Sequence, residues 1–125
     1  MAKRGTKRRK ARPKSRSRKP RSRGGGKASR VGVTLTVMLR AREDQELLLE
    51  AELRALVNPT RKENGCLRYD LYRSADAPHA FLLHEVWASR EHHRLHTQTP
   101  HFLRWDARKD ALLVSREATF WSYLT

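Results

Sequence analysis

The sequence predicts a small α+β domain that follows a strongly basic segment, and three observations support this. The chain of 125 residues is long enough for one domain. Apolar residues recur regularly only from Val31 onward, and their period alternates between that of strands and that of helices. These patterns follow the order strand, helix, strand, strand, helix, strand. We therefore expect one domain in residues 31–125 and a separate tail in residues 1–30.

The tail of residues 1–30 accounts for the net charge of the chain. The formal charge of +15 comes from 28 Lys and Arg against 13 Asp and Glu. Fifteen of the basic residues and none of the acidic ones lie in the tail, so residues 31–125 are formally neutral. Dense like charge, two prolines and almost no apolar side chains predict disorder, with a flexible joint at the three glycines of residues 24–26.

Two functions remain open for this tail. Its side chains could bind the phosphates of nucleic acid in a salt-sensitive manner, but without aromatic residues they would not read bases. Alternatively, the tail serves only as a solubilising extension. The neutral domain gives no sign of a basic nucleic-acid surface of its own.

The sequence favours a cytoplasmic location. The single cysteine, Cys66, excludes an internal disulfide and fits a reducing compartment. No apolar run approaches the roughly 18 residues of a membrane span, and the N-terminal segment lacks the apolar stretch of a secretory signal. We therefore expect no membrane association.

The first two elements follow from their apolar periods. Alternate residues from Val31 to Leu39 are apolar, which is the pattern of a half-buried strand. Residues 43–57 place leucines at helical spacing and glutamates on the remaining face. The leucines are Leu49, Leu53 and Leu56, and the glutamates are Glu46, Glu50 and Glu52. Pro59 is expected to end or kink this helix.

Two strands come next. Asn64 and Gly65 predict a turn into a strand at residues 66–73. One face of that strand is expected to carry Leu67, Tyr69 and Leu71. A second strand at residues 80–87 is largely apolar on both faces. One of its faces carries Phe81, Leu83, Glu85 and Trp87.

Two short helices and a last strand complete the order. Ser89 is a favourable N-cap for a helix that carries several histidines, and Thr99 before Pro100 predicts a second helix start. The second helix is expected to reach about Leu112. Residues 118–124 form the last predicted strand. The result is the split βαβ, ferredoxin-like arrangement, with both helical segments on one face of the sheet.

The other face of this sheet is left without a helix. Residues 80–87 are apolar on both sides, and Phe120 lies opposite Trp121 and Tyr123 in the last strand. We therefore expect the bare face to meet a second copy of the chain in a homodimer.

The segment HHRLHTQTPH holds four of the six histidines. His92 and His96 lie four residues apart, so a helix would bring both imidazoles to one face, as a metal site requires. A metal site also needs a third ligand, and the sequence offers no second cluster of ligands at suitable spacing. We therefore expect no metal at this pair.

Three motifs resemble those of a known family. They are GCLRYDLYR at residues 65–73, F-x-x-x-EVW at 81–87 and H-x-x-TPHF at 96–102. In this order and at these separations they resemble the antibiotic biosynthesis monooxygenase family, including its quinol monooxygenase-like members. The resemblance covers residues 31–125 and omits the tail.

This resemblance implies a dimeric α+β barrel with a pocket between helices and sheet in each subunit. It also implies oxygenation of quinols or phenol-like aromatics without metal or flavin, with molecular oxygen as the co-substrate. Related members degrade haem or isomerise small molecules, so the fold alone does not fix the chemistry. We expect a cofactor-independent monooxygenase; the alternatives are a haem-degrading or isomerase relative, or a dimerising module that binds polyanions through its tail.

The resemblance and the residue chemistry together indicate a candidate site. His96 matches the family histidine and can take a phenolic proton near neutral pH. If its strand face is interior, Glu85 is buried and must be paired or protonated; it could orient His96, bind a substrate hydroxyl or play a structural role. The substrate-binding candidates are Tyr69, Trp87, His101 and Phe102. Each of these also has a structural reading as a core or helix-start residue, and the neighbours of His96 are expected to be solvated.

Overall fold

The computed structural model describes residues 32–125, so the tail predicted at residues 1–30 lies outside the described residues. The elements are β1 (Val33–Ala41), α3 (Glu46–Arg61), β2 (Cys66–Arg73), β3 (Ala80–Trp87), α4 (Arg90–His96), α5 (Pro100–Leu112) and β4 (Leu113–Trp121). This confirms the predicted order of strands and helices. Within the same residues, no helix has the length and apolar character needed to cross a membrane.

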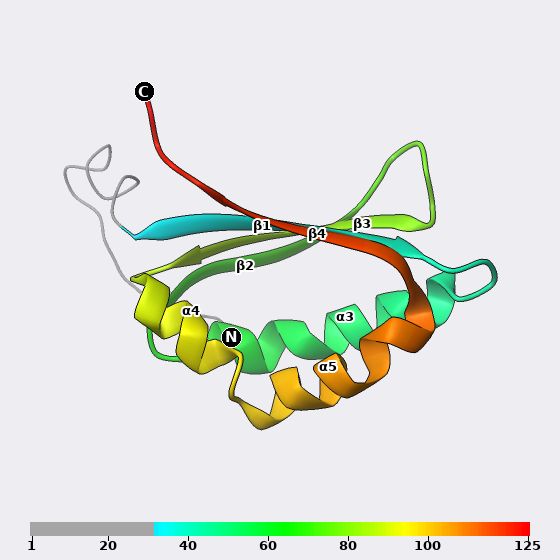
Figure 1. Ribbon diagram of the computed structural model, residues 1–125, viewed down its shortest axis with the longest axis horizontal. Helices are drawn as coiled ribbons and strands as arrows, with labels where there is room; N and C mark the ends of the chain where they lie inside the picture. The colour runs from blue at the N-terminus through cyan, green and yellow to red at the C-terminus, as the bar shows by residue number, and fades with distance from the viewer. Residues whose placement is uncertain (1–31) are drawn as a thin grey trace, which may run out of the picture. The chain divides into compact units, whose positions relative to one another are not determined.

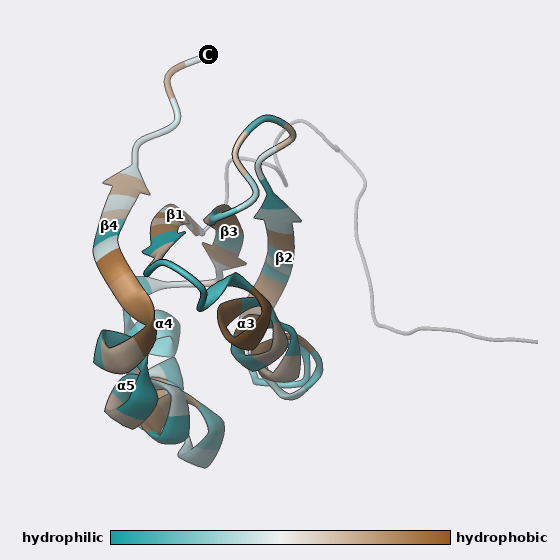
Figure 2. Ribbon diagram, turned by 90° about the vertical axis from the view of Figure 1, so that its right-hand side faces the viewer, coloured by the Kyte–Doolittle hydropathy of each residue, from teal (hydrophilic) through white to brown (hydrophobic). Residues whose placement is uncertain are grey.

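The four strands form one antiparallel sheet in the order β2-β3-β1-β4. All three helices lie on one side of it (Figure 1), and the view turned by 90° shows the same two layers (Figure 2). The ferredoxin-like α+β fold is thus confirmed. The opposite face of the sheet is not covered by any helix of residues 32–125, and a second copy there stays a prediction.

The core lies between the sheet and the helices. Leu35, Val37 and Leu39 of β1 are buried, as their alternation predicts. The leucines predicted for the inner face of α3, at positions 49, 53 and 56, are buried against them. Removing a side chain of this size from water contributes roughly 1.5–3 kcal/mol. These contacts hold the helices against the sheet.

Pro59 does not end the first helix, because α3 continues to Arg61. Tertiary contacts favour the extra residues, since Thr60 is fully buried and the Arg61 guanidinium donates to the backbone oxygen of Tyr69 and to Asp70. Tertiary packing here outweighs the local cost of a proline within the helix.

A β-bulge at the start of β2 changes the predicted face of that strand. Cys66 pairs with Trp87 and Arg68 with Val86, which leaves Leu67 as the extra residue. Leu67 is therefore 57% exposed, and the prediction that it shares a face with Tyr69 was wrong. The inner face begins with Cys66.

The turn before β2 requires glycine. Gly65 has a φ of +85°, and a β-carbon at this position would lie 2.2 Å from Cδ2 of His92. Its backbone oxygen also accepts from Ala88 N at 2.8 Å. The turn thus lies against the start of α4.

The last strand is displaced from its prediction. It runs from Leu113 to Trp121, directly after α5, rather than over residues 118–124. Residues 114–118 are exposed, so they give no alternating apolar pattern, and pairing with β1 alone makes them a strand.

Candidate active site

His96 is the last residue of α4 and is almost completely buried, with 1% of its surface exposed. Three aromatic rings surround its imidazole. The centroid distances are 4.8 Å to Trp87, 5.0 Å to Phe102 and 5.7 Å to Tyr69. The two strands β2 and β3 and the first turn of α5 supply these rings. The fold therefore brings together four residues that the sequence indicated separately.

Glu63 joins this cluster and was missed by sequence reasoning. Its Oε2 atom lies 2.8 Å from Nδ1 of His96 and 2.6 Å from Nε2 of His101. Glu63 follows α3 by two residues and precedes the Asn64-Gly65 turn. Its position next to that turn was the available signal, but the three motifs that indicated the site begin at Gly65 and do not include Glu63.

Glu63 determines which nitrogen of His96 is free to act. A carboxylate oxygen only accepts hydrogen bonds, so Nδ1 of His96 carries the proton and the lone pair lies on Nε2. Within residues 32–125, Nε2 has no hydrogen-bond partner. Burial lowers the pKa of His96 below its usual value, against the hydrogen bond with Glu63, which raises it. The imidazole is thus neutral at neutral pH, as a base must be.

Glu85 is buried beside this cluster, with 3% of its surface exposed. It is both paired and close to protonation: Oε1 accepts from Nε1 of Trp87 at 2.9 Å, and burial raises its pKa to about 7. Its hydrogen bond therefore orients the Trp87 indole, and the carboxylate that contacts His96 is Glu63.

Tyr69 and Cys66 are neutral groups in this environment. Burial raises the pKa of the Tyr69 hydroxyl well above its usual value, so the hydroxyl remains a hydrogen-bond donor. Burial also raises the pKa of the Cys66 thiol to about 12, which leaves it a poor nucleophile.

The neighbouring histidines differ from expectation. His93 is not solvated: its ring is half-buried, with centroids 5.3 Å from Phe120 and 6.0 Å from Trp87, and burial lowers its pKa to about 4. It packs between Phe120 and Trp87 as a neutral ring. His92 is also partly buried, and its Nδ1 lies 2.8 Å from the Oγ of Ser89, the predicted N-cap.

Three of these groups could hold a metal ion, although the sequence suggested no third ligand. The ligand atoms of Glu63, His96 and His101 all lie within 4.8 Å of one another. Two imidazoles and one carboxylate suit zinc or iron. The pair of His92 with His96, at which the sequence predicted no metal, is not this set, because His92 is hydrogen-bonded to Ser89 instead.

The comparisons with known proteins agree with this fold. The model of the family described as antibiotic biosynthesis monooxygenase matches residues 32–108. The protein named Putative monooxygenase Rv0793, from Mycobacterium tuberculosis, is 41% identical over 73 residues, or 58% of this chain and 71% of that protein.

Two solved structures are similar over nearly their whole length. PA3566 from Pseudomonas aeruginosa has a TM-score of 0.74 and 36% identity, covering 76% of this chain and 96% of that one. Rv0793 has a TM-score of 0.70 and 35% identity, covering 74% and 95%. The matched family model spans more than half of the chain and includes His96 and the residues around it. The chain therefore belongs to the antibiotic biosynthesis monooxygenase family.

Proposed function

We propose that this chain is a cofactor-independent monooxygenase that oxidises quinol- or phenol-like aromatic compounds, with His96 as its general base. One observation carries the proposal. Nδ1 of His96 is hydrogen-bonded to Glu63, so the lone pair of the imidazole is on Nε2, and three aromatic rings surround the imidazole. A base in an aromatic environment suits a planar substrate with an acidic hydroxyl.

The reaction needs no electron donor other than the substrate. Nε2 of His96 removes the phenolic proton, and the resulting electron-rich anion passes an electron to dioxygen. Carbon–oxygen bond formation and loss of water follow. For a hydroquinone, one oxygen atom enters the ring, the other leaves as water, and the product is a hydroxyquinone. The substrate supplies both electrons that reduce the second oxygen atom.

The surrounding residues have separate roles in this proposal. The Tyr69 hydroxyl donates a hydrogen bond to the substrate oxygen that gains charge. Trp87 and Phe102 stack on the ring, and Glu85 fixes the indole of Trp87. His101 also contacts the carboxylate of Glu63 and so helps to hold that carboxylate in position beside His96. Glu63 acts through His96 and is a positioning residue.

Substrate entry requires a side chain to move, because Tyr69, Trp87 and His96 are almost completely buried. Phe102 and His101, in the first turn of α5, are only partly buried. We place the entrance at this turn, where displacement of the Phe102 ring would expose Nε2 of His96.

The test compares two histidines one helical turn apart. With metal removed by a chelator, the protein should accelerate the aerobic oxidation of a hydroquinone or phenol, with dioxygen uptake as the measurement. His96→Ala should lower kcat/KM by about a hundredfold or more, as expected for loss of a positioned base. His92→Ala, the matched control, should change it little. Full activity in His96→Ala, or activity that is lost in the chelator and restored by zinc or iron, would overturn the mechanism.

The proposal includes a homodimer joined through the sheet face opposite the helices. Met38, Tyr72 and Trp121 are exposed large side chains on strands β1, β2 and β4 of that face. Sedimentation equilibrium at micromolar concentration should give twice the mass of one chain. A monomer under these conditions would contradict it.

A further inference from the structure

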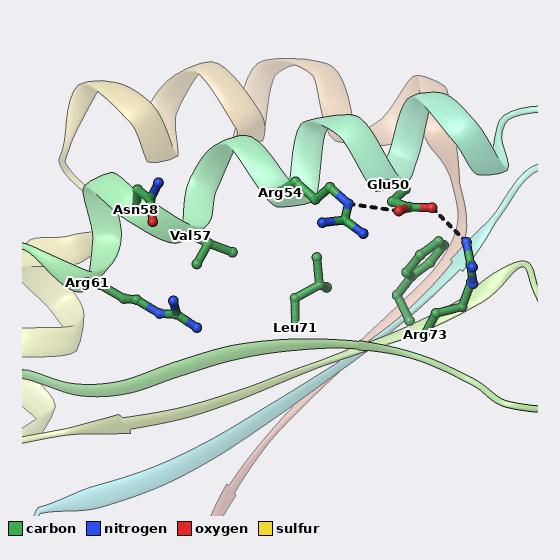
Figure 3. Close-up of a pocket in the computed structure, with 8 residues that line it drawn as sticks. Glu50, Arg54, Val57, Asn58, Arg61, Leu71 and Arg73 are labelled. Atoms are coloured by element: carbon green, nitrogen blue, oxygen red, sulfur yellow. Dashed lines mark hydrogen bonds and ion pairs between the residues drawn. The ribbon is translucent and has the colours of Figure 1, made fainter. Parts of the chain in front are cut away.

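A groove opens between α3 and β2, apart from the rings around His96 (Figure 3). Its volume is about 410 Å³, within the roughly 300–1,000 Å³ typical of small-molecule sites. The residues that line it are Glu50, Arg54, Val57, Asn58, Arg61, Leu71, Arg73 and Phe81. It is therefore large enough for a small organic molecule.

The lining is apolar in the middle and charged toward both ends. Val57 of α3 and Leu71 of β2 face each other across the groove (Figure 3). Arg54 and Arg73 converge on Glu50 at one end, and Arg61 lies toward the other. An elongated ligand would thus meet apolar walls along its body and guanidinium groups at its end.

Glu50 orients two of the arginines and leaves most of their donors free. Its Oε2 accepts from Nε of Arg54 at 2.8 Å, and its Oε1 accepts from Nη1 of Arg73 at 2.7 Å. In the part of the chain that the structure describes, both Nη atoms of Arg54 and the Nε and Nη2 atoms of Arg73 make no hydrogen bond. The two side chains are 72% and 50% exposed, so an incoming ligand can reach them.

Arg61 has a different role. Its Nε donates to the backbone oxygen of Tyr69 and its Nη2 to Asp70, both at 3.0 Å. These bonds tie α3 to β2 and fix the width of the groove at that end. Because Arg61 is paired with Asp70, the two arginines at Glu50 against that one carboxylate leave a surplus of one positive charge in the groove. The remaining positive potential favours an anion.

We propose that this groove binds an organic anion with an apolar body, such as an aromatic carboxylate. The carboxylate would accept from the free Nη donors of Arg54 and Arg73, and the ring would lie between Val57 and Leu71. An inorganic anion would leave the apolar walls without a contact, and a neutral aromatic would leave the two guanidinium groups without one. This site does not depend on the base chemistry of His96, because neither the charges nor the walls of the groove include that residue.

The test uses the full chain, labelled with nitrogen-15, and 2-naphthoate as the probe. The backbone amide resonances of Val57, Asn58 and Leu71 report the groove itself, so anion binding to the basic tail does not interfere. Naphthoate should shift these resonances saturably. The neutral isostere 2-naphthalenemethanol should bind at least about tenfold more weakly, because it offers no charge for the arginines.

Arg54→Gln and Arg73→Gln should each weaken naphthoate binding by at least about fivefold. Arg108→Gln is the matched control, since Arg108 pairs with Glu52 outside the groove; it should bind like the unaltered chain. Unchanged resonances elsewhere verify that the variants are folded. His96→Ala should also bind normally, which separates this site from the proposed activity. Equal binding of the neutral isostere, equal shifts from inorganic phosphate, or full affinity in both arginine variants would overturn the proposal.

Discussion

Two glutamates, one in α3 and one just after it, each hold a pair of basic side chains, but the two clusters differ in what they can do. Glu50 accepts from Arg54 and Arg73, whose side chains are at least half exposed. Glu63 accepts from His96 and His101, which are almost fully and largely buried. One carboxylate thus lies between two basic side chains in both clusters, but the first cluster is exposed to solvent and the second is buried.

The difference lies in whether the base can lose its proton. Guanidinium groups stay charged at any physiological pH, so the cluster at Glu50 can attract an anion but cannot accept a proton. Imidazoles titrate near neutral pH, and burial keeps His96 neutral, so the cluster at Glu63 can accept one. A carboxylate between two basic side chains is therefore suited to anion binding at Glu50 and to proton transfer at Glu63.

The largest expected effect concerns the burial of the cluster at Glu63. Glu85 is buried beside this cluster, so its protonation measures how well water is excluded there. Its pKa of about 7 in the folded chain exceeds the ordinary value of 4.5. Its contribution to stability is therefore complete below pH 4.5 and is lost as the pH rises through 7, by about 3 kcal/mol in total. Glu85→Gln keeps an acceptor for Trp87 and should be more stable than the parent at pH 8.5. Urea unfolding at pH 4.5 and 8.5 measures this, and an equal difference between the two proteins at both pH values would contradict it.

A second effect separates the two glutamates directly. Glu63→Gln should lower kcat by at least about tenfold, because the amide no longer selects the Nδ1–H form of His96. The hydrogen bond with Glu63 raises the pKa of His96, so its loss should move the midpoint of the pH–rate profile to lower pH. A purely structural role would not move that midpoint. Glu50→Gln, the matched control, should leave both the rate and the profile unchanged.

The smallest expected effect is that of salt on the contribution of the Glu50 ion pairs to Tm. Glu50→Gln should lower Tm by about 2 °C or less, since exposed ion pairs contribute little. In 1 M NaCl the difference from the unaltered chain should vanish, because exposed charges are screened. Circular dichroism measures the Tm. A difference that persists in high salt would mean that the ion pairs of Glu50 are more shielded from solvent than their exposure indicates.

The fold was predictable because its signals are local. Alternation along β1 and β3, helical spacing of the leucines in α3, and the N-caps Ser89 and Thr99 each specify an element within a few residues. The errors arose where distant contacts decide. Pro59 is held within α3 by the contacts of Thr60 and Arg61, and the bulge after Cys66 depends on pairing with β3.

The candidate site was predictable only in part. His96, Tyr69, Trp87 and Phe102 were identified from strand faces and motif resemblance, and they do lie together. Glu63 lies 33 residues before His96, so no local pattern links them. The groove was also missed, because Arg54 on the helix and Arg73 at the end of the edge strand β2 look like ordinary solvated residues until the two elements are placed side by side.

Gly65 has a consequence for how this sequence can diverge. A side chain at position 65 would collide with the ring of His92, one turn before the proposed base. Two costs therefore act against a side chain at position 65: the left-handed φ of +85° strains any residue with a β-carbon, and the ring of His92 occupies the space that the side chain would need. A small residue at 92 would remove only the second cost, so descendants of this chain should keep glycine at 65 whatever residue stands at 92. Paired substitutions at 65 and 92 should consequently be tolerated better than the single change at 65.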